Sequence, residues 1–412
     1  MGARRISATA WGLFLCGAAL LAEPVQVVAF RLGTMRSPEG SGSWRHWNAY
    51  GHQPQKKDGV WSDFASAQKP GWGPYDASEA DVITAEAQVL AWSGVRAVAL
   101  WAAPYREDGQ GRTLALTASI LMRYHLLLSV WSASPRSAAE MWKTLPSHDL
   151  FRWKGRPVVF LTELPERRAA EMDEAKKAHP EILWVGPATA AFTHLFDAAF
   201  LPPPDPSRRG RRDQPPWSFA WNLQEALRAQ VEDRDRFLSN FLNHAPSGED
   251  AGPRLIAESL SAGLDDSAVG GYGKGARRIE GGDALVRGTW DLATNHHADF
   301  VTFGPVDQWN EGSAWYPTVE DGAAHLSELR RLARPEKADT PKESAAVYQT
   351  ISLAHLLKKQ FPEWKGARDL RNWEEALARG EDAATCLKFW SALEASLPSH
   401  VRRSLRDEGR TP

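Results

Sequence analysis

One short segment of the sequence combines an acidic side chain with polar and aromatic neighbours. It reads Val306-Asp307-Gln308-Trp309-Asn310-Glu311-Gly312-Ser313-Ala314-Trp315-Tyr316-Pro317. A positioned carboxylic acid such as Glu311 can give a proton to a leaving oxygen. Flat apolar rings that also donate a hydrogen bond suit the stacked faces of sugars. The segment therefore favours acid–base chemistry on a sugar, although a surface loop whose tryptophans pack onto the protein below is an equally open interpretation.

An apolar strand must position this segment. Residues Asp299 to Phe303 alternate and include β-branched and aromatic types, which predicts a short buried strand ended by Gly304-Pro305. Glu311 is then expected in a loop at the carboxyl end of that strand. In β/α barrels the active site is built on this face.

Strand-like and helical patterns alternate along the chain. The predicted strands are Val25 to Phe30, Val95 to Trp101, Leu126 to Trp131, Pro157 to Thr162, Ile182 to Val185, Ala198 to Leu201, Trp217 to Trp221, Arg254 to Ser259 and Phe300 to Phe303. The predicted helices are Ser78 to Trp92, Ser137 to Leu145, Pro165 to Ala178, Leu223 to Leu242 and Asp283 to Asn295. This order predicts a parallel sheet, and about eight strands favour closure into a β/α (TIM-type) barrel. An open doubly wound sheet is the alternative.

Length and composition set the frame for such a barrel. The chain has 412 residues, a formal net charge of -2 and 19 tryptophans. The charge balance gives no footprint of a nucleic-acid partner. We expect the barrel over residues 23–335. Beyond about Arg334 the sequence is rich in Lys, Glu and Ala, which predicts a small helical C-terminal appendage over 336–412.

The first 22 residues have the pattern of a signal peptide. Arg4-Arg5 precede an apolar stretch from Trp11 to Leu21, which is too short for a stable membrane span. We expect export to the periplasm or the medium, with lipoprotein anchoring at Cys16 as a weaker possibility and a cytoplasmic chain as the alternative. After cleavage Cys386 is the only cysteine, which leaves no internal disulfide.

Carboxylates are the remaining candidates for chemistry. The sequence has no Gly-x-Ser-x-Gly elbow, no His-Glu-x-x-His and no phosphate-binding glycine loop, and it implies no cofactor or metal. Cleavage of a glycoside needs a protonated carboxyl and usually a second group at the anomeric carbon. The acidic residues at predicted strand ends are Asp76, Glu163, Asp265, Asp266, Asp307 and Glu311.

Several motifs, in the same order along the chain, resemble those of glycoside hydrolase family 99, the endo-α-mannosidases, and of family 71-like proteins. Their signature has the form Asn-Glu-Trp-His-Glu-Gly-Thr with a Pro soon after, and here the matching stretch is Asp307 to Ser313 with Pro317. The other matches are His46-Trp47-Asn48, Gly73-Pro74-Tyr75-Asp76, Ala91 to Val95 and Ser261 to Asp266.

This resemblance implies a β/α barrel that acts on an oligosaccharide or polysaccharide with α-linked sugars. The general acid/base of the family falls on Glu311. The carboxylate that acts on the sugar's own 2-hydroxyl falls on Gln308, which cannot take a proton but can orient a hydroxyl. A second departure is Ser129 to Ala133, where the family often carries a Glu and this chain has none.

Three interpretations follow. In the first, the protein is an active hydrolase in which Asp307 or Glu163 replaces the missing base. In the second, it binds sugars without cleaving them, and in the third the matches reflect barrel architecture alone. The expected substrate-binding residues are His46, Trp47, Asn48, Tyr75, Asp76, Trp101, Trp131, Glu163, Asp265, Asp266, Trp309, Asn310, Trp315 and Tyr316.

Overall fold

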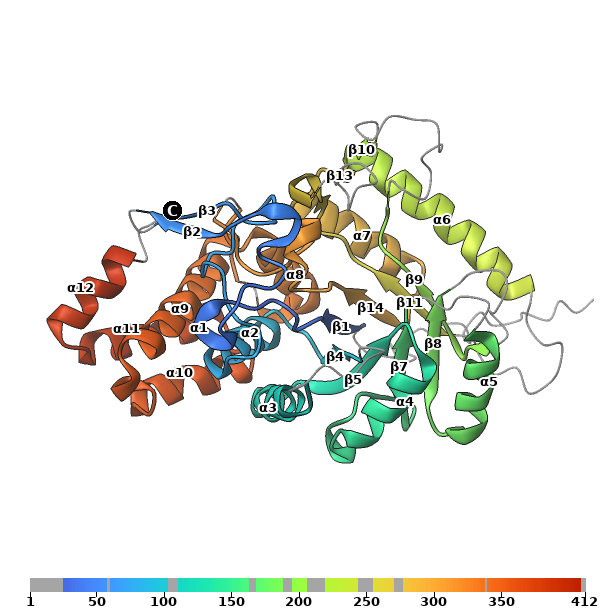
Figure 1. Ribbon diagram of the computed structural model, residues 1–412, viewed down its shortest axis with the longest axis horizontal. Coiled ribbons are helices and arrows are strands. Elements are labelled where there is room, and N and C mark those ends of the chain that lie inside the picture. The colour runs from blue at the N-terminus through green and yellow to red at the C-terminus, as the bar shows by residue number, and fades with distance from the viewer. Residues whose placement is uncertain are drawn as a thin grey trace, which may run out of the picture.

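A computed structural model shows a closed barrel of eight parallel strands (Figure 1). It describes residues 25–57, 60–102, 110–162, 168–187, 195–205, 219–243, 255–269, 277–319, 321–337 and 339–408. The barrel strands are β1 Gln26–Arg31, β4 Ala97–Trp101, β5 Leu127–Ser132, β7 Arg156–Leu161, β8 Leu183–Pro187, β9 Ala198–Leu201, β11 Leu255–Ser259 and β14 Phe300–Phe303. They follow one another around the barrel in chain order, and β14 pairs with β1. The predicted barrel is confirmed, and the open sheet is excluded.

Alternation along each strand separates the barrel interior from its outer surface. On β1, Val28 and Phe30 belong to the interior cluster, whereas Val27 and Ala29 belong to the cluster that includes the surrounding helices. The Phe30 ring stacks on Trp131, with 5.2 Å between ring centroids. This filled interior is a packed core and leaves no open channel through the barrel.

Aromatic side chains close the amino end of the barrel. The short strand β6 Arg152–Trp153 pairs antiparallel with β7. The rings of Phe151 and Trp153 lie 5.6 and 4.9 Å from the ring of Phe300, which is the first residue of β14.

Helices surround the strands as the alternating pattern predicts. Their bounds are α1 Pro38–Ser41, α2 Ala80–Trp92, α3 Gln110–Arg123, α4 Pro135–Thr144, α5 Ala169–Ala178, α6 Leu223–Asn243, α7 Asp283–Asn295 and α8 Ala324–Ala333. The sequence did not predict α3, which lies between β4 and β5. It contains Thr113, Thr117 and Ser119, residue types of modest helix propensity that obscure its pattern.

One predicted strand lies outside the barrel. The run Trp217 to Trp221 yields β10 Phe219–Trp221, which pairs with β13 Arg277–Ile279 in a small separate sheet. β12 Leu264–Asp265 completes that sheet. Its expected place in the barrel was wrong because the other eight strands already close the ring. A further hairpin, β2 Gln55–Lys57 with β3 Val60–Ser62, lies in the long excursion that follows β1.

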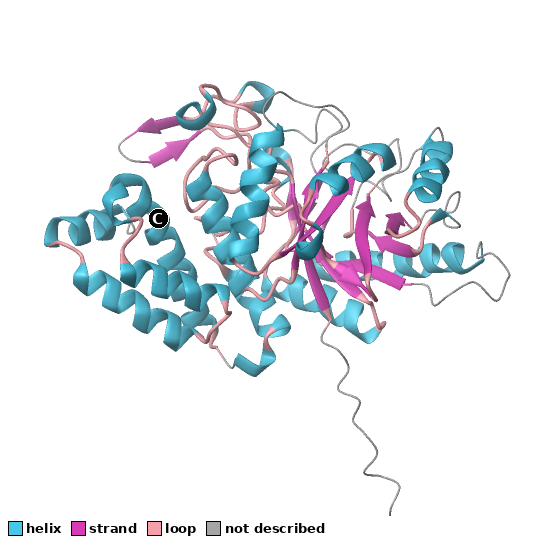
Figure 2. Cartoon of the chain, turned by 90° about the horizontal axis from the view of Figure 1, so that it is seen from below, coloured by secondary structure: helices cyan, strands magenta, loops and turns pink. Residues whose placement is uncertain are grey.

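The C-terminal appendage consists of α9 Pro341–Gln360, α10 Arg368–Ala378, α11 Ala383–Ser396 and α12 Ser399–Glu408. These helices lie together on one side of the barrel (Figure 1 and Figure 2). Of them, α9 and α10 pack on α2. The first of them begins with a full capping box, in which Thr340 and Glu343 satisfy each other's backbone N–H groups.

A buried arginine joins the appendage to the barrel. The guanidinium of Arg330, on α8, lies over the Trp92 ring at 3.7 Å from its centroid and pairs with Asp339 at 2.6 Å. It also donates to the backbone oxygens of Trp92 and Glu381.

No helix in the described ranges is both long and apolar enough to cross a membrane. The predicted signal peptide, with Cys16, lies outside the described residues.

Candidate functional site

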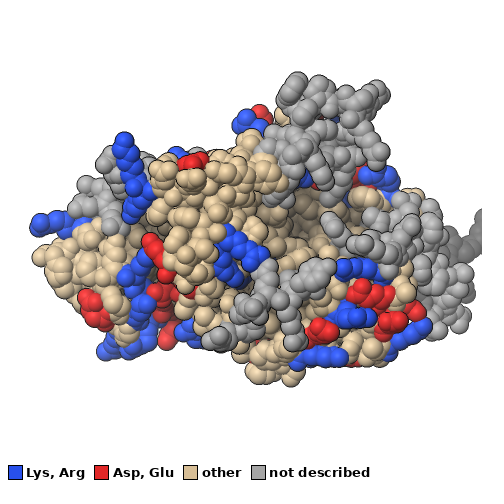
Figure 3. Space-filling model, viewed as in Figure 1, with Lys and Arg blue, Asp and Glu red and all other residues tan. Residues whose placement is uncertain are grey.

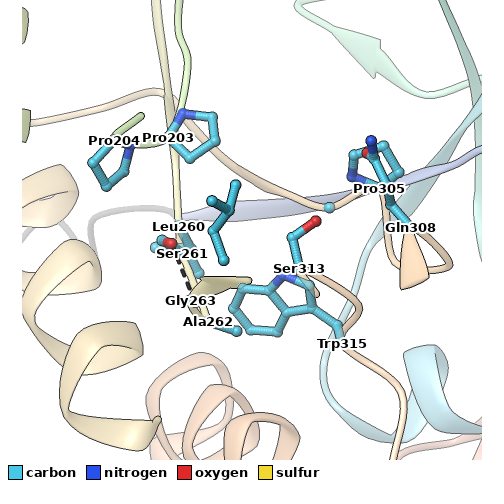
Figure 4. Close-up of a pocket in the computed structure, with 12 residues that line it drawn as sticks. Pro203, Pro204, Leu260, Ser261, Ala262, Gly263, Pro305, Gln308, Ser313 and Trp315 are labelled. Carbon is cyan, nitrogen blue, oxygen red and sulfur yellow. Dashed lines mark hydrogen bonds between the residues drawn. The ribbon is translucent and has the colours of Figure 1, made fainter. Parts of the chain in front are cut away.

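A cleft of about 100 Å³ opens at the carboxyl ends of β9, β11 and β14. Its lining is mostly apolar, with the Gln308 amide and the hydroxyls of Ser261 and Ser313 as polar side-chain groups (Figure 4). The described lining residues are Pro203, Pro204, Leu260, Ser261, Ala262, Gly263, Leu264, Gly304, Pro305, Gln308, Ser313 and Trp315. None of them carries a charge. The described cleft is smaller than the roughly 300–1,000 Å³ of usual ligand pockets.

The loop from Val306 to Pro317, called the signature loop below, forms one wall of this cleft. Gly304 leads into it with φ of 102°, and a Cβ there would lie 2.8 Å from the Phe30 oxygen. The N–H of Val306 donates to that same oxygen at 2.7 Å. The N–H of Trp315 then donates to the Val306 oxygen, which folds the loop back on itself.

Asp307 ties the signature loop to the end of β1. Its two carboxylate oxygens accept the N–H groups of Leu32 and Gly33 at 2.8 and 2.6 Å, and its side chain is fully buried. Gln308, the next residue, lines the cleft. In this arrangement Asp307 holds the backbone that presents Gln308, and both of its oxygens are engaged.

The centre of the signature loop packs into the protein. The Trp309 ring is fully buried, and its Nε1 donates to the Tyr75 hydroxyl at 2.8 Å. Trp47 is also fully buried, and its Nε1 donates to the backbone carbonyl oxygen of Tyr75. Asn310 donates to the backbone oxygens of His46 and Ala65. The structure thus brings five predicted sugar contacts together, but as parts of one packed cluster below the cleft.

Trp72 packs between the end of the signature loop and the appendage. The Tyr316 ring, 1% exposed, stacks on Trp72 with 5.5 Å between centroids. Trp72 in turn lies 5.9 Å from the His355 ring and donates to the Ser352 hydroxyl at 2.9 Å. Both partners belong to α9, so the first appendage helix supports the signature loop. Trp315 lines the cleft (Figure 4), but it is only 2% exposed and its ring packs on Phe303 with 4.4 Å between centroids.

Two aspartates follow β11 and serve different contacts. Asp266 is fully buried and pairs with Arg277 at 2.6 Å. Asp265 is partly exposed, and its backbone lies against Gly312, where a Cβ would come within 2.5 Å of the Asp265 oxygen. Gly312 has φ of 56° and directly follows Glu311. The turn at Asp265 therefore adjoins the candidate acid/base position.

The remaining predicted contacts are spread over the carboxyl end of the barrel. Trp101 and Trp131, at the ends of β4 and β5, lie with ring centroids 4.4 Å apart but are not among the described residues of the cleft. Asn48 is exposed on the excursion after β1. Asp76 is fully buried, where it accepts the N–H of Ser78 at 2.8 Å.

Glu163 lies outside the described residues. Glu311 ends the 3₁₀ turn η8 Trp309–Glu311, and only its backbone belongs to the described part of the chain. Sequence reasoning did not name Pro203, Pro204, Leu260 or Ser313 as cleft residues. Their positions just beyond β9, β11 and β14 are the signal that marks them.

On the face in Figure 3, the basic and acidic side chains of the described residues are intermingled.

Comparisons with solved structures show which barrels this fold is similar to. No protein-family model matches the sequence, and no curated protein matches it significantly. Among solved structures, the GH99 endo-alpha-mannosidase from Bacteroides thetaiotaomicron is similar, with a TM-score of 0.54 and 14% identity over 78% of this chain and 98% of that one. The same enzyme in complex with bis-tris-propane gives a TM-score of 0.53 and 13% identity, covering 79% and 98%. At such low identity the likeness shows the fold alone: the chain is a β/α barrel similar to the barrel of these glycoside hydrolases.

Proposed function

We propose that this protein is a glycoside hydrolase that acts on α-linked glycans, such as mannosides, at the carboxyl end of its barrel. The observation that carries the proposal is the position of the signature loop, whose Gln308 and Trp315 line the cleft and whose Glu311 adjoins the turn at Asp265. The fold likeness to an endo-alpha-mannosidase, covering 98% of that chain, supports this class of substrate and, more specifically, membership of family 99.

Within this proposal Glu311 is the general acid/base. It gives its proton to the glycosidic oxygen as the bond to the anomeric carbon breaks, and later takes a proton from the water that completes hydrolysis. Gln308 holds a sugar hydroxyl through its amide, which both donates and accepts. Asp307 serves to position Gln308, because its two oxygens already accept backbone N–H groups. Glu163 remains the candidate for a second carboxylate.

A specific observation also favours a second function, carbohydrate binding without hydrolysis. None of the described residues that line the cleft is a carboxylate, and the position of the family's base holds Gln308. An amide and apolar rings suffice to bind a sugar. In this case the apolar wall and Trp315 carry recognition, while Glu311 contributes little to affinity.

Hydrolysis of an α-linked aryl mannoside and of an α-linked manno-oligosaccharide decides between the two. We expect turnover by the wild type, its loss in Glu311→Gln, and no change in Glu280→Gln, which alters an exposed glutamate of the same type. Gln308→Glu should raise the rate if a base is missing. Calorimetric binding of the oligosaccharide without turnover in any variant supports the binding function. If the protein shows no binding and no turnover, both proposed functions are overturned.

We further propose that the protein is exported, on the basis of the signal-peptide pattern in residues 1–22. Amino-terminal sequencing of the mature protein tests this, because export by this route predicts a new terminus near Ala19 or Ala22. An intact Met1 on the mature protein contradicts it.

A further inference from the structure

A cluster of buried charges lies directly behind the signature loop. The Arg31 side chain, at the end of β1, points out of the barrel toward α2, where its Nε donates to Glu86 Oε2 at 2.7 Å. Its Nη2 donates to the Ala77 oxygen at 2.7 Å. Arg31 is 4% exposed, and Glu86 and Asp307 are fully buried. We refer to Arg31, Glu86 and Asp307 as the buried charge cluster.

This cluster includes the beginning of the signature loop, at Asp307. Asp307 belongs to the loop itself and holds the N–H groups of Leu32 and Gly33. The Arg31 guanidinium packs against Gly33, where a Cβ would lie 2.5 Å from Arg31 Nη1. Together these contacts run from α2 through β1 to the loop that presents Gln308 to the cleft.

Two tyrosines complete the surroundings of Glu86. Glu86 is hydrogen-bonded to Arg31 from β1 and lies within electrostatic range of Asp307 and Tyr316 from the signature loop and of Tyr75 from the segment before α2. Tyr75 accepts the hydrogen bond of the Trp309 ring, and Tyr316 ends the loop. A change of charge at Glu86 is therefore felt by Asp307 and Tyr316 of the signature loop, and by Tyr75, which holds the Trp309 ring.

The cluster holds two carboxyl groups and one cation. With both carboxyls ionised it carries a net negative charge out of contact with water, which is costly because a buried charge needs a partner. Two polar atoms here, Glu86 Oε1 and the Tyr316 hydroxyl, find no hydrogen-bond partner among the described residues. Burial raises the pKa of Glu86 to about 7, with Arg31 opposing the shift and Asp307 adding to it.

We propose that Glu86 is a positioning residue for the signature loop, and that it holds the loop in its working arrangement by keeping a proton, acting through Arg31 and Asp307. Loss of this proton leaves a buried net charge, which favours opening of the loop and entry of water. The proposal rests on the proposed function in one respect, since the loop carries Gln308 and Glu311. Its structural part stands independently of any substrate.

Hydrogen exchange at the Leu32 and Gly33 amides tests the structural part. In the wild type, we expect the protection of these two amides, corrected for intrinsic rates, to fall about tenfold or more between about pH 6 and about pH 8, the effect of roughly one pKa unit. Glu86→Gln, which keeps the shape of the protonated acid, should show no such fall. The matched control is Glu258→Gln, since Glu258 is also buried and paired with an arginine, Arg234, at 2.6 Å, but on the α6 side of the barrel. It should behave as the wild type does.

Binding of an α-linked mannotriose, measured by calorimetry over the same pH range, tests the link to the site. We expect affinity to fall with rising pH in the wild type and in Glu258→Gln, and to stay level in Glu86→Gln. A pH-independent protection of the two amides in the wild type overturns the proposal without any variant. The same fall in Glu86→Gln as in the wild type also overturns it. If the sugar does not bind at all, the proposed function fails, while the exchange result still decides the role of Glu86.

Discussion

Replacement of Arg330 by methionine removes the buried contact that joins the barrel to the appendage. The guanidinium is 1% exposed, lies over the Trp92 ring at 3.7 Å and pairs with Asp339 at 2.6 Å. Asp339 also accepts the N–H of Ala383 at the start of α11. In Arg330→Met this carboxylate stays in place, 6% exposed, without its cation.

The expected loss of stability is about 3–5 kcal/mol, because removing one partner of a buried pair leaves the other charge uncompensated. This is a large part of the roughly 5–15 kcal/mol by which folded domains are stable. Methionine fills much of the volume of the arginine stem, so a cavity contributes little. In the double variant with Asp339→Asn, the loss should be smaller than the sum of the single losses by about 0.5–3 kcal/mol.

Urea unfolding followed by circular dichroism measures these losses. Arg331→Met is the control, because Arg331 is the next residue and is 46% exposed, and its partner Glu328, 5% exposed, keeps a second cation, Arg287, at 2.6 Å. It should cost no more than about 1 kcal/mol. If Arg330→Met costs no more than Arg331→Met, the reasoning about the buried pair is refuted. Two separate transitions in the wild type would show that residues 336–412 unfold as a domain of their own.

Three further changes have defined outcomes. Because burial raises the pKa of Glu86 to about 7 from 4.5, its contribution to stability is complete below about pH 4.5 and lost as pH rises through 7. That loss is about 3 kcal/mol at 1.36 kcal/mol per unit, so the unfolding free energy of Glu86→Gln should fall less over this pH range than that of the wild type. Ser352→Ala removes the acceptor of the Trp72 ring N–H and should lower the unfolding free energy in urea by about 1 kcal/mol. An unchanged unfolding free energy contradicts the idea that α9 supports the signature loop. Gly263 has φ of 124°, and Gly263→Ala places a Cβ 2.7 Å from the Cα of Gly281. The substitution should lower stability in thermal denaturation by about 1–3 kcal/mol or more. An unaffected melting temperature would count against this close approach.

The barrel was predictable because its strands are short apolar runs separated by amphipathic helices. That pattern survives in the sequence wherever both faces of a strand are buried, as on β4 and β5. It fails for Trp217 to Trp221, since an aromatic run of the same kind also fits the small sheet with β13. Pattern alone does not specify the strand with which a segment pairs.

The signature loop was located correctly, but the tasks of its residues were harder to predict. Aromatic rings suit both cores and sugar sites, and Trp309 and Tyr316 are almost fully buried. Asp307 was a candidate for the missing base because it is acidic and directly precedes Gln308. Its actual contacts are two backbone N–H groups at the end of β1, which are 275 and 274 residues away in sequence. Nothing local reveals such a partner.

Arg31 and Glu86 show a signal that the sequence does contain. Each is a charged residue within an otherwise apolar element, Arg31 at the end of β1 and Glu86 among the buried residues of α2. Charges in such places are rarely buried unless they are paired. An arginine and a glutamate placed in this way in neighbouring elements predict a buried contact between the two side chains, although not which loop it supports.

The barrel interior is packed, and the described cleft opens at the carboxyl end, opposite the aromatic closure. Phe151, Trp153 and Phe300 block the end opposite the cleft. A ligand must therefore enter and leave on the same side, and a bound product obstructs the arrival of the next molecule. For the same reason, an antibody fragment bound over the carboxyl ends of the strands would obstruct every route to the cleft, whereas one bound at the amino end would leave access open.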